Sequence, residues 1–325
     1  MSVLYLRNQG CYLRKNGGRY VITQKQEEIK SVPKAAVERV VVLGNCQIST
    51  QAMSDLLGDG VEIVYLGANG RFKGILEPGY PRNVFVRLAQ YERSLDPEYS
   101  VAVAREVARA KLEGSLRSIA AWTRRGWLDS DGHEAPIKAA QQRLKRCSDA
   151  ASVRGQEAGA ARAHFAALGD ALPPPFEWHG RNRRPPRDPV NALLSLTYML
   201  ALSEVVSACY AHGLDPCIGF LHELDYSRPS LALDLLEPLR TLHCDHIVLG
   251  CLQREDLGIG DFQYSEEQGC RLTTEGFRPY IDQYHRASTK GIGKRPSLVS
   301  HANALATAMA NAVRQRIPLV LESLH

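Results

Sequence analysis

The apolar pattern of this chain changes once along its length, near residues 76–83, and no other feature constrains the fold as much. Before that point, short β-branched runs such as VERVVVL (37–43) and VEIVYL (61–66) are separated by glycine-containing turn signals, a pattern typical of strands. One stretch, STQAMSDLLG (49–58), has the spacing of a short helix, and Ser49 is placed to cap it. The first part of the chain is therefore predicted to be β-rich.

From Val84 onward, apolar residues recur mostly at helical spacing, as in the segments 102–122 and 191–211. A chain of 325 residues is long enough for two domains that each bury a core. We therefore expect an α+β protein in which a small β-rich N-terminal domain, residues 1–80, is followed by a larger all-α C-terminal domain, residues 84–325.

Composition narrows the function classes. Hydrophobic residues make up 44% of the chain and charged residues 23%, and no apolar run approaches membrane-spanning length, so we expect a soluble protein without a membrane partner. The first residues lack the pattern of a secretory signal, and the eight cysteines are scattered singly without a C-x-x-C pair. Both features favour a cytoplasmic protein with reduced cysteines.

Basic residues are clustered although the formal net charge is only +5. The clusters lie at 122–127, 142–147, 179–187 and 288–295. One such cluster is as often a solvated face as a binding site, but four in one chain favour a polyanionic partner such as nucleic acid. The third cluster lies in the proline-rich segment 169–189, which is longer than most connections and is predicted to be a functional loop.

The stretch GFLHELDYSRPSLALDLLE (219–237) carries the strongest candidate site. Pro229 favours the start of a helix, on which Asp234 and Glu237 share one narrow strip while leucines cover the rest. That strip could simply be a solvent-exposed face. Alternatively, His222 could meet the strip, and acids that converge with an imidazole among apolar residues need a compensating cation. The pattern leaves both a surface and a metal site open.

Glu157 is a further candidate ligand, in the segment SVRGQEAGAARAHF (152–165). Its neighbours in that predicted helix are mostly glycine and alanine, which would leave the carboxylate accessible from a tight groove. An alanine-rich helix with one glutamate is unremarkable by itself.

Several stretches of the chain resemble, in the same order, the spacer-integrating nucleases of CRISPR adaptation, the family of the first CRISPR-associated protein (Cas-one). The matching stretches are ERVVVLGNCQIST (38–50), GRFKGIL (70–76), RGQEAGAARAHF (154–165), RNRRPPRDPVNALLSLTY (181–198) and LDPCIGFLHELDYSRPSLALDLLEPLR (214–240). The resemblance implies a β-rich N-terminal domain that forms a homodimer. It also implies an all-helical C-terminal domain that holds one divalent metal ion, Mg²⁺ or Mn²⁺.

By this resemblance the metal ligands are Glu157, His222 and Glu237, with Asp234 as an accessory acid. We also expect Arg228 to balance charge that develops in the reaction, arginines of the 181–187 loop to hold the DNA backbone, and two residues to line the site; a structural role is the alternative for each. The arginines are Arg181, Arg183, Arg184 and Arg187, and the lining residues are Asn191 and Tyr198.

The resemblance implies an integrase, in which the 3′-hydroxyl of a short captured DNA attacks a phosphodiester of a CRISPR array while the metal acts as a Lewis acid. The implied partners are double-stranded DNA, a second copy of the chain and a small dimeric partner protein of the adaptation complex. One alternative is a general metal-dependent nuclease that acts on branched DNA. The other is a non-catalytic DNA-binding scaffold, which three cation ligands in a DNA-facing groove argue against.

The chain departs from the family pattern at a few positions. His164 stands where a tyrosine is common, and KLEGSLR (111–117) lacks a common asparagine-glutamine pair. The segment LHCDHIV (242–248) is unusual because it carries His243, Cys244, Asp245 and His246. Strand-like alternation would place these four side chains on two sides, so we expect them to be mainly structural and not a second metal site.

Overall fold

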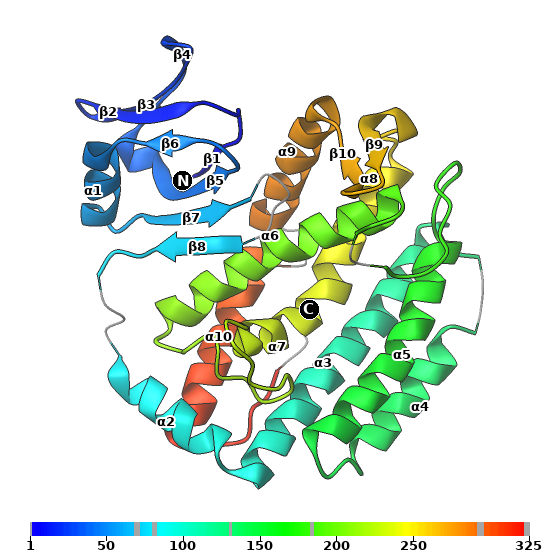
Figure 1. Ribbon diagram of the computed structural model, residues 1–325. Helices are drawn as coiled ribbons and strands as arrows, with labels where there is room; N and C mark the ends of the chain where they lie inside the picture. The colour runs from blue at the N-terminus through cyan, green and yellow to red at the C-terminus, as the bar shows by residue number, and fades with distance from the viewer. Residues whose placement is uncertain are drawn as a thin grey trace. The chain divides into compact units, whose positions relative to one another are not determined.

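The computed structural model describes residues 2–67, 72–79, 83–129, 132–182, 185–290 and 296–321 (Figure 1). The chain divides into two compact units, Met1–Tyr80 and Pro81–His325. The predicted DNA contacts at Arg183 and Arg184 lie outside the described residues.

The first unit contains two four-stranded sheets and a short helix. One sheet has the order β1 (Ser2–Leu6), β5 (Val37–Leu43), β7 (Glu62–Leu66) and β8 (Phe72–Leu76), in which the first three strands are parallel and β8 is antiparallel. The other has the order β4 (Glu27–Pro33), β3 (Arg19–Gln24), β2 (Tyr12–Asn16) and β6 (Gln47–Ile48), and a 3₁₀ turn, Lys34–Ala36, precedes β5.

The sequence pattern explains this unit locally. In β5 every residue except Glu38 is buried, as expected for an inner parallel strand that is covered on both faces. The predicted short helix is α1 (Thr50–Gly58), and the Ser49 hydroxyl accepts a hydrogen bond from Ala52 N at 3.1 Å, which confirms the predicted cap. Leu13, Tyr20 and Ile63 are fully buried in the core between these elements.

The second unit is mostly helical. Its α-helices are α2 (Val84–Ser94), α3 (Pro97–Arg124), α4 (Glu134–Leu144), α5 (Ala150–Asp170), α6 (Pro189–Ala211), α7 (Ser230–Leu239), α8 (Asp245–Gln253), α9 (Thr274–Lys290) and α10 (Leu298–Gln315). A π-helical turn, Arg240–Cys244, joins α7 to α8, and a 3₁₀ turn, Ile259–Asp261, follows α8. Helices α3, α4 and α5 lie side by side (Figure 1).

The prediction that this unit is all-α is wrong in one place, because β9 (Phe262–Ser265) and β10 (Gly269–Leu272) form an antiparallel hairpin. Gly269 has φ +68°, and a Cβ at this position would lie 2.2 Å from the Pro186 carbonyl oxygen. Cys270 N donates to the same oxygen at 2.8 Å. The hairpin is thus stabilised by a contact with the distant loop before α6. The apolar spacing of the sequence does not predict such a contact.

Helix α6 is buried on nearly all sides, with 16 of its 23 residues buried. By length and composition alone this helix could cross a membrane, which contradicts the expectation that no apolar run is long enough. However, 78% of its most apolar window is buried inside the protein. A helix that is apolar all round is also what the centre of a large helical core requires.

Candidate functional site

Four elements bring Glu157, His222 and Glu237 together around Lys111. Glu157 lies on α5, Glu237 on α7, Lys111 on α3, and His222 in the loop before α7. The Lys111 ammonium donates to Glu157 Oε1 and, at 2.5 Å, to Glu237 Oε2. His222 Nε2 lies 3.8 Å from Glu237 Oε1. The three residues that the sequence predicted as ligands are therefore neighbours, with a buried cation between the two glutamates.

Asp234 holds His222 in place. Its fully buried carboxylate accepts hydrogen bonds from the backbone amides of Phe220, Leu221 and His222 at 2.6, 3.0 and 2.9 Å. The same carboxylate accepts from His222 Nδ1 at 2.7 Å. This contact fixes the orientation of the imidazole and places Nε2 on the side of Glu237. The acidic strip of α7 is therefore internal, and the interpretation as a solvent-exposed face is wrong.

The close approach of this loop to α7 requires glycine at position 219. A Cβ there would lie 2.7 Å from the backbone of Ser230 and 2.9 Å from Asp234 Oδ2. Any larger residue would push the loop away from α7. The sequence GFLH thus places His222 because its glycine allows the backbone to reach the Asp234 carboxylate.

The cluster is built from opposite charges. Burial raises the pKa of Glu237, but Arg240, Lys111 and His222 more than offset this and lower that pKa to about 2. Burial lowers the pKa of Lys111, and the Glu237 and Glu157 carboxylates more than offset this, so its pKa is raised. Arg240 Nη1 lies 3.0 Å from Glu237 Oε1. Glu237 and Lys111 therefore remain charged at neutral pH.

The donor set suits a hard divalent cation. Two carboxylates and an imidazole nitrogen are ligands that Mg²⁺ and Mn²⁺ accept, and the Lys111 ammonium already shows that the carboxylates hold a positive charge. Among the described residues, no three His, Cys, Asp or Glu side chains meet at metal-binding spacing. The Lys111 ammonium lies between the two glutamates that would have to converge.

Sequence reasoning missed Lys111. The signal is present, since Lys111 falls on the buried face of α3 in register with Ala104, Ala108 and Ser115, where an apolar or small residue is expected. A lysine that is only 8% exposed on such a face needs a carboxylate partner.

Arg240 was also missed, and Tyr198 positions it. The Arg240 and Arg181 guanidinium carbons lie 4.9 and 5.5 Å from the centre of the Tyr198 ring. Burial raises the pKa of Tyr198 well above its usual value, and its hydroxyl donates to Asp245 Oδ1 at 2.5 Å. Tyr198 thus lies one side chain away from the acidic cluster and supports the arginine that contacts Glu237.

Asn191 organises the loop before α6. Its side-chain oxygen accepts from Arg181 Nη1 at 2.7 Å and from Asn182 N at 3.0 Å, and its amide nitrogen donates to Asp188 Oδ2 at 2.6 Å. Arg181 is therefore held by the protein, whereas the Arg187 side chain is exposed. Within the described part of the chain, half-buried Arg228 makes no ion pair with the cluster.

The segment 242–248 is helical, so the predicted strand-like alternation is wrong. These residues form the end of the π-helical turn and the start of α8, because α7 continues through them without a break. Their side chains make internal contacts. His243 Nε2 lies 3.0 Å from His301 Nδ1, His164 Nε2 lies 2.7 Å from Asp245 Oδ2, and Trp122 Nε1 donates to His246 Nδ1 at 3.3 Å.

Known structures share this fold. A casposase bound to its integration product has a TM-score of 0.87 and 23% identity and covers 100% of this chain and 94% of that chain. A Cas6-RT-Cas1–Cas2 complex gives a TM-score of 0.82 and 18% identity over 99% of this chain and 36% of that chain. A β-rich unit followed by a mostly helical unit is therefore the fold that this chain shares with these proteins.

The sequence places the chain within that class. Residues 4–286 match the family described as CRISPR associated protein Cas1. The CRISPR-associated endonuclease Cas1 3 of Thermus thermophilus is 35% identical over 268 residues, which cover 82% of this chain and 79% of the relative. The chain belongs to the Cas1 family, which confirms the resemblance seen in the sequence.

Proposed function

We propose that this protein is a metal-dependent DNA integrase of CRISPR adaptation, which joins the 3′-hydroxyl of a short captured DNA to a phosphodiester of the CRISPR array. The observation that carries the proposal is that Glu157 and Glu237 both contact the buried Lys111 ammonium, with His222 Nε2 3.8 Å from Glu237 Oε1. Membership of a family whose relatives are named endonucleases supports the same chemistry. With water as the nucleophile, the same cluster would hydrolyse DNA.

Each residue has a separate task in this proposal. Glu157 and Glu237 supply oxygen ligands, His222 supplies Nε2, and Asp234 fixes the imidazole so that its proton stays on Nδ1. Arg240 stabilises the charged form of Glu237 and is itself held by the Tyr198 ring. A bound Mg²⁺ or Mn²⁺ would supply Lewis acidity at the phosphoryl oxygen.

The partners follow from the proposed reaction. We assign double-stranded DNA as the substrate, and the casposase structure with its integration product supports that choice. A homodimer formed by the β-rich unit and a small dimeric adaptation protein complete the assembly, and the Cas1–Cas2 complex of similar fold supports the second. The protein acts in the cytoplasm, without a membrane partner.

Strand joining tests the proposal directly. Purified protein, Mn²⁺, supercoiled plasmid and a short duplex with free 3′-hydroxyls are mixed with and without the adaptation partner. Covalent attachment of the duplex to the plasmid is expected, and EDTA should prevent it. Cleavage without joining in the presence of the partner would favour the nuclease, and DNA binding without either reaction would favour the scaffold.

A further inference from the structure

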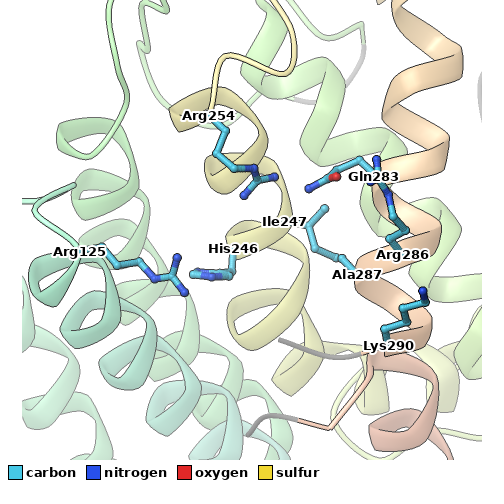
Figure 2. Close-up of a pocket in the computed structure, with 8 residues that line it drawn as sticks. All are labelled: Arg125, His246, Ile247, Arg254, Gln283, Arg286, Ala287 and Lys290. Carbon is cyan, nitrogen blue, oxygen red and sulfur yellow. The ribbon is translucent and has the colours of Figure 1, made fainter. Parts of the chain in front are cut away.

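A second positively charged feature lies away from the acidic cluster. The described part of the helical unit contains a cavity of about 270 Å³ among α3, α8 and α9 (Figure 2). Its polar lining residues are Arg125, Arg254, Arg286, Lys290, His246 and Gln283. Four of them carry a permanent positive charge, and none of the described lining residues is acidic.

The cations come from separate elements that converge on this cavity. On α9, Gln283, Arg286 and Lys290 are spaced three and seven residues apart, so they share one face of the helix. Arg254 follows the end of α8, and Arg125 follows the end of α3. Figure 2 shows the α9 side chains on one side of the space, with Arg125 and His246 on the other.

One wall of the cavity is formed by packed aromatic side chains and His246. His246 is buried, and its Nδ1 accepts from Trp122 Nε1 at 3.3 Å, which places the proton of the neutral imidazole on Nε2. The Arg125 guanidinium carbon lies 4.9 Å from the centre of the Trp127 ring, and that ring lies 5.6 Å from the His246 ring. The Arg125 charge is thus held over an aromatic surface at one wall.

Acidic residues compensate this charge only in part. Arg254 pairs with Asp256 at 2.8 Å, whereas no ion pair of Arg125, Arg286 or Lys290 is found among the described residues. Each of the four basic side chains is exposed. Like charges that converge on one cavity repel each other, and a bound anion would relieve that repulsion.

We propose that this cavity binds a phosphate group of the DNA backbone, at a position separate from the acidic cluster. The inference rests on the proposed function for its choice of anion. Arginine forks recognise phosphate oxygens in pairs, and the cavity supplies three of them together with a lysine. Contacts of this kind position DNA without reading its sequence.

The distance between the cavity and the acidic cluster is short enough for one DNA molecule to contact both. Arg125 follows Lys111 by 14 positions along α3 and its end, which corresponds to about 20 Å of helix. Phosphates of one strand of a duplex are about 3.4 Å apart along the duplex axis, so a duplex that lies along this direction spans the separation in about six nucleotide steps. A strand end at the cluster could therefore reach this cavity within the same substrate.

The test compares two double variants that each remove two positive charges. Arg286→Ala with Lys290→Ala removes charge from the cavity, whereas Lys138→Ala with Arg314→Ala removes it from exposed positions on α4 and α10 that lie outside the basic clusters. Affinity for a short duplex is measured across a salt series. The cavity variant should bind at least about tenfold more weakly, with a log–log salt slope shallower by about 0.9 per lost phosphate contact. The control variant should stay close to the wild type.

Folding and the proposed reaction are monitored in the same preparations. Both variants should keep the wild-type thermal midpoint and Mn²⁺ affinity. An unchanged affinity and slope in the cavity variant, or an equal loss in the control variant, would overturn the proposal. Stabilisation of the wild type by inorganic phosphate, with unchanged DNA affinity in the cavity variant, would assign the cavity to free phosphate instead. Wild-type strand joining is measured alongside, so a failure of the proposed function is recognised separately.

Discussion

Lys111 Nζ lies 2.5 Å from Glu237 Oε2 in the interior of the helical unit, although the two residues are 126 positions apart. The same ammonium contacts Glu157, so one lysine side chain connects α3, α5 and α7. A buried positive charge therefore stabilises the two glutamates in the absence of metal. It also occupies the place where a divalent cation would contact both carboxylates.

Replacement of Lys111 by methionine should make the protein depend on metal for stability. Loss of one partner of a buried ion pair costs about 3–5 kcal/mol, because the two glutamates would then lie close together without compensation. We expect a lower thermal midpoint in EDTA, recovery in Mn²⁺, and tighter Mn²⁺ binding by calorimetry than in the wild type. Lys138→Met, which removes an exposed lysine paired with Glu134, is the matched control. Equal Mn²⁺ affinity and equal midpoints in Lys111→Met and wild type would contradict the role assigned to Lys111.

Glu157→Ala, His222→Ala and Glu237→Ala should each reduce strand joining by more than about 100-fold, because each removes a predicted metal ligand. None removes a positive charge, so DNA affinity across a salt series should remain at the wild-type value. Joining is measured at saturating DNA. Full activity in all three variants would show that the cluster is not the catalytic centre.

Asp234→Asn separates positioning from charge. The asparagine oxygen can still accept from Phe220 N and Leu221 N, but the amide nitrogen then replaces Oδ1, so the variant removes both the acceptor and the negative charge opposite His222 Nδ1. Metal affinity should fall by about 10–100-fold, whereas Asp234→Ala should also unfold at lower temperature because three backbone amides lose their acceptor. Calorimetry with Mn²⁺ and thermal unfolding measure the two effects. Wild-type metal affinity in Asp234→Asn would mean that Asp234 only supports the loop.

His301 should make stability depend on pH. Burial lowers its pKa from 6.5 to about 4, so the folded protein resists protonation of this side chain. Below pH 6.5 the unfolded chain binds a proton at His301 that the folded protein does not bind. The free energy of unfolding therefore has its full value above pH 6.5 and falls by up to about 3 kcal/mol as the pH falls towards 4. Chemical unfolding at several pH values should therefore show a steeper loss in wild type than in His301→Gln, whose side chain does not titrate. Identical pH profiles would refute this assignment.

The β-rich unit should carry the homodimer contact. A fragment that begins at Val84 lacks that unit and should be monomeric by light scattering at concentrations where the whole chain is dimeric. A dimeric fragment would move the interface to the helical unit.

Local signals predicted much of the fold and of the cluster. Ser49 could be identified as a helix cap because its partner amide is three residues away. Asp234 and Glu237 could be placed on one strip of a helix because they are one turn apart, and the structure shows that strip to be buried. The small neighbours of Glu157 made it a further candidate, but only the family resemblance connects it with the other two.

Contacts between distant segments could not be predicted in this way. Lys111 meets Glu157 across 46 positions and Glu237 across 126, so no window of the sequence contains the cluster. The β9–β10 hairpin is stabilised by the Pro186 carbonyl, about 80 residues earlier. The helical state of residues 242–248 depends on continuation from α7, which overrides their apparent alternation.

Helix α3 extends from Pro97 to Arg124 without a break, with Lys111 near its middle and Arg125 directly after its end. Because a helix turns by about 100° per residue, the 14 positions between Lys111 and Arg125 bring the two side chains to within about 40° of the same face. A single inserted residue would rotate one against the other by about 100°, whereas a conservative substitution would leave the spacing intact. The segment between Lys111 and Arg125 should therefore tolerate substitutions much better than insertions or deletions.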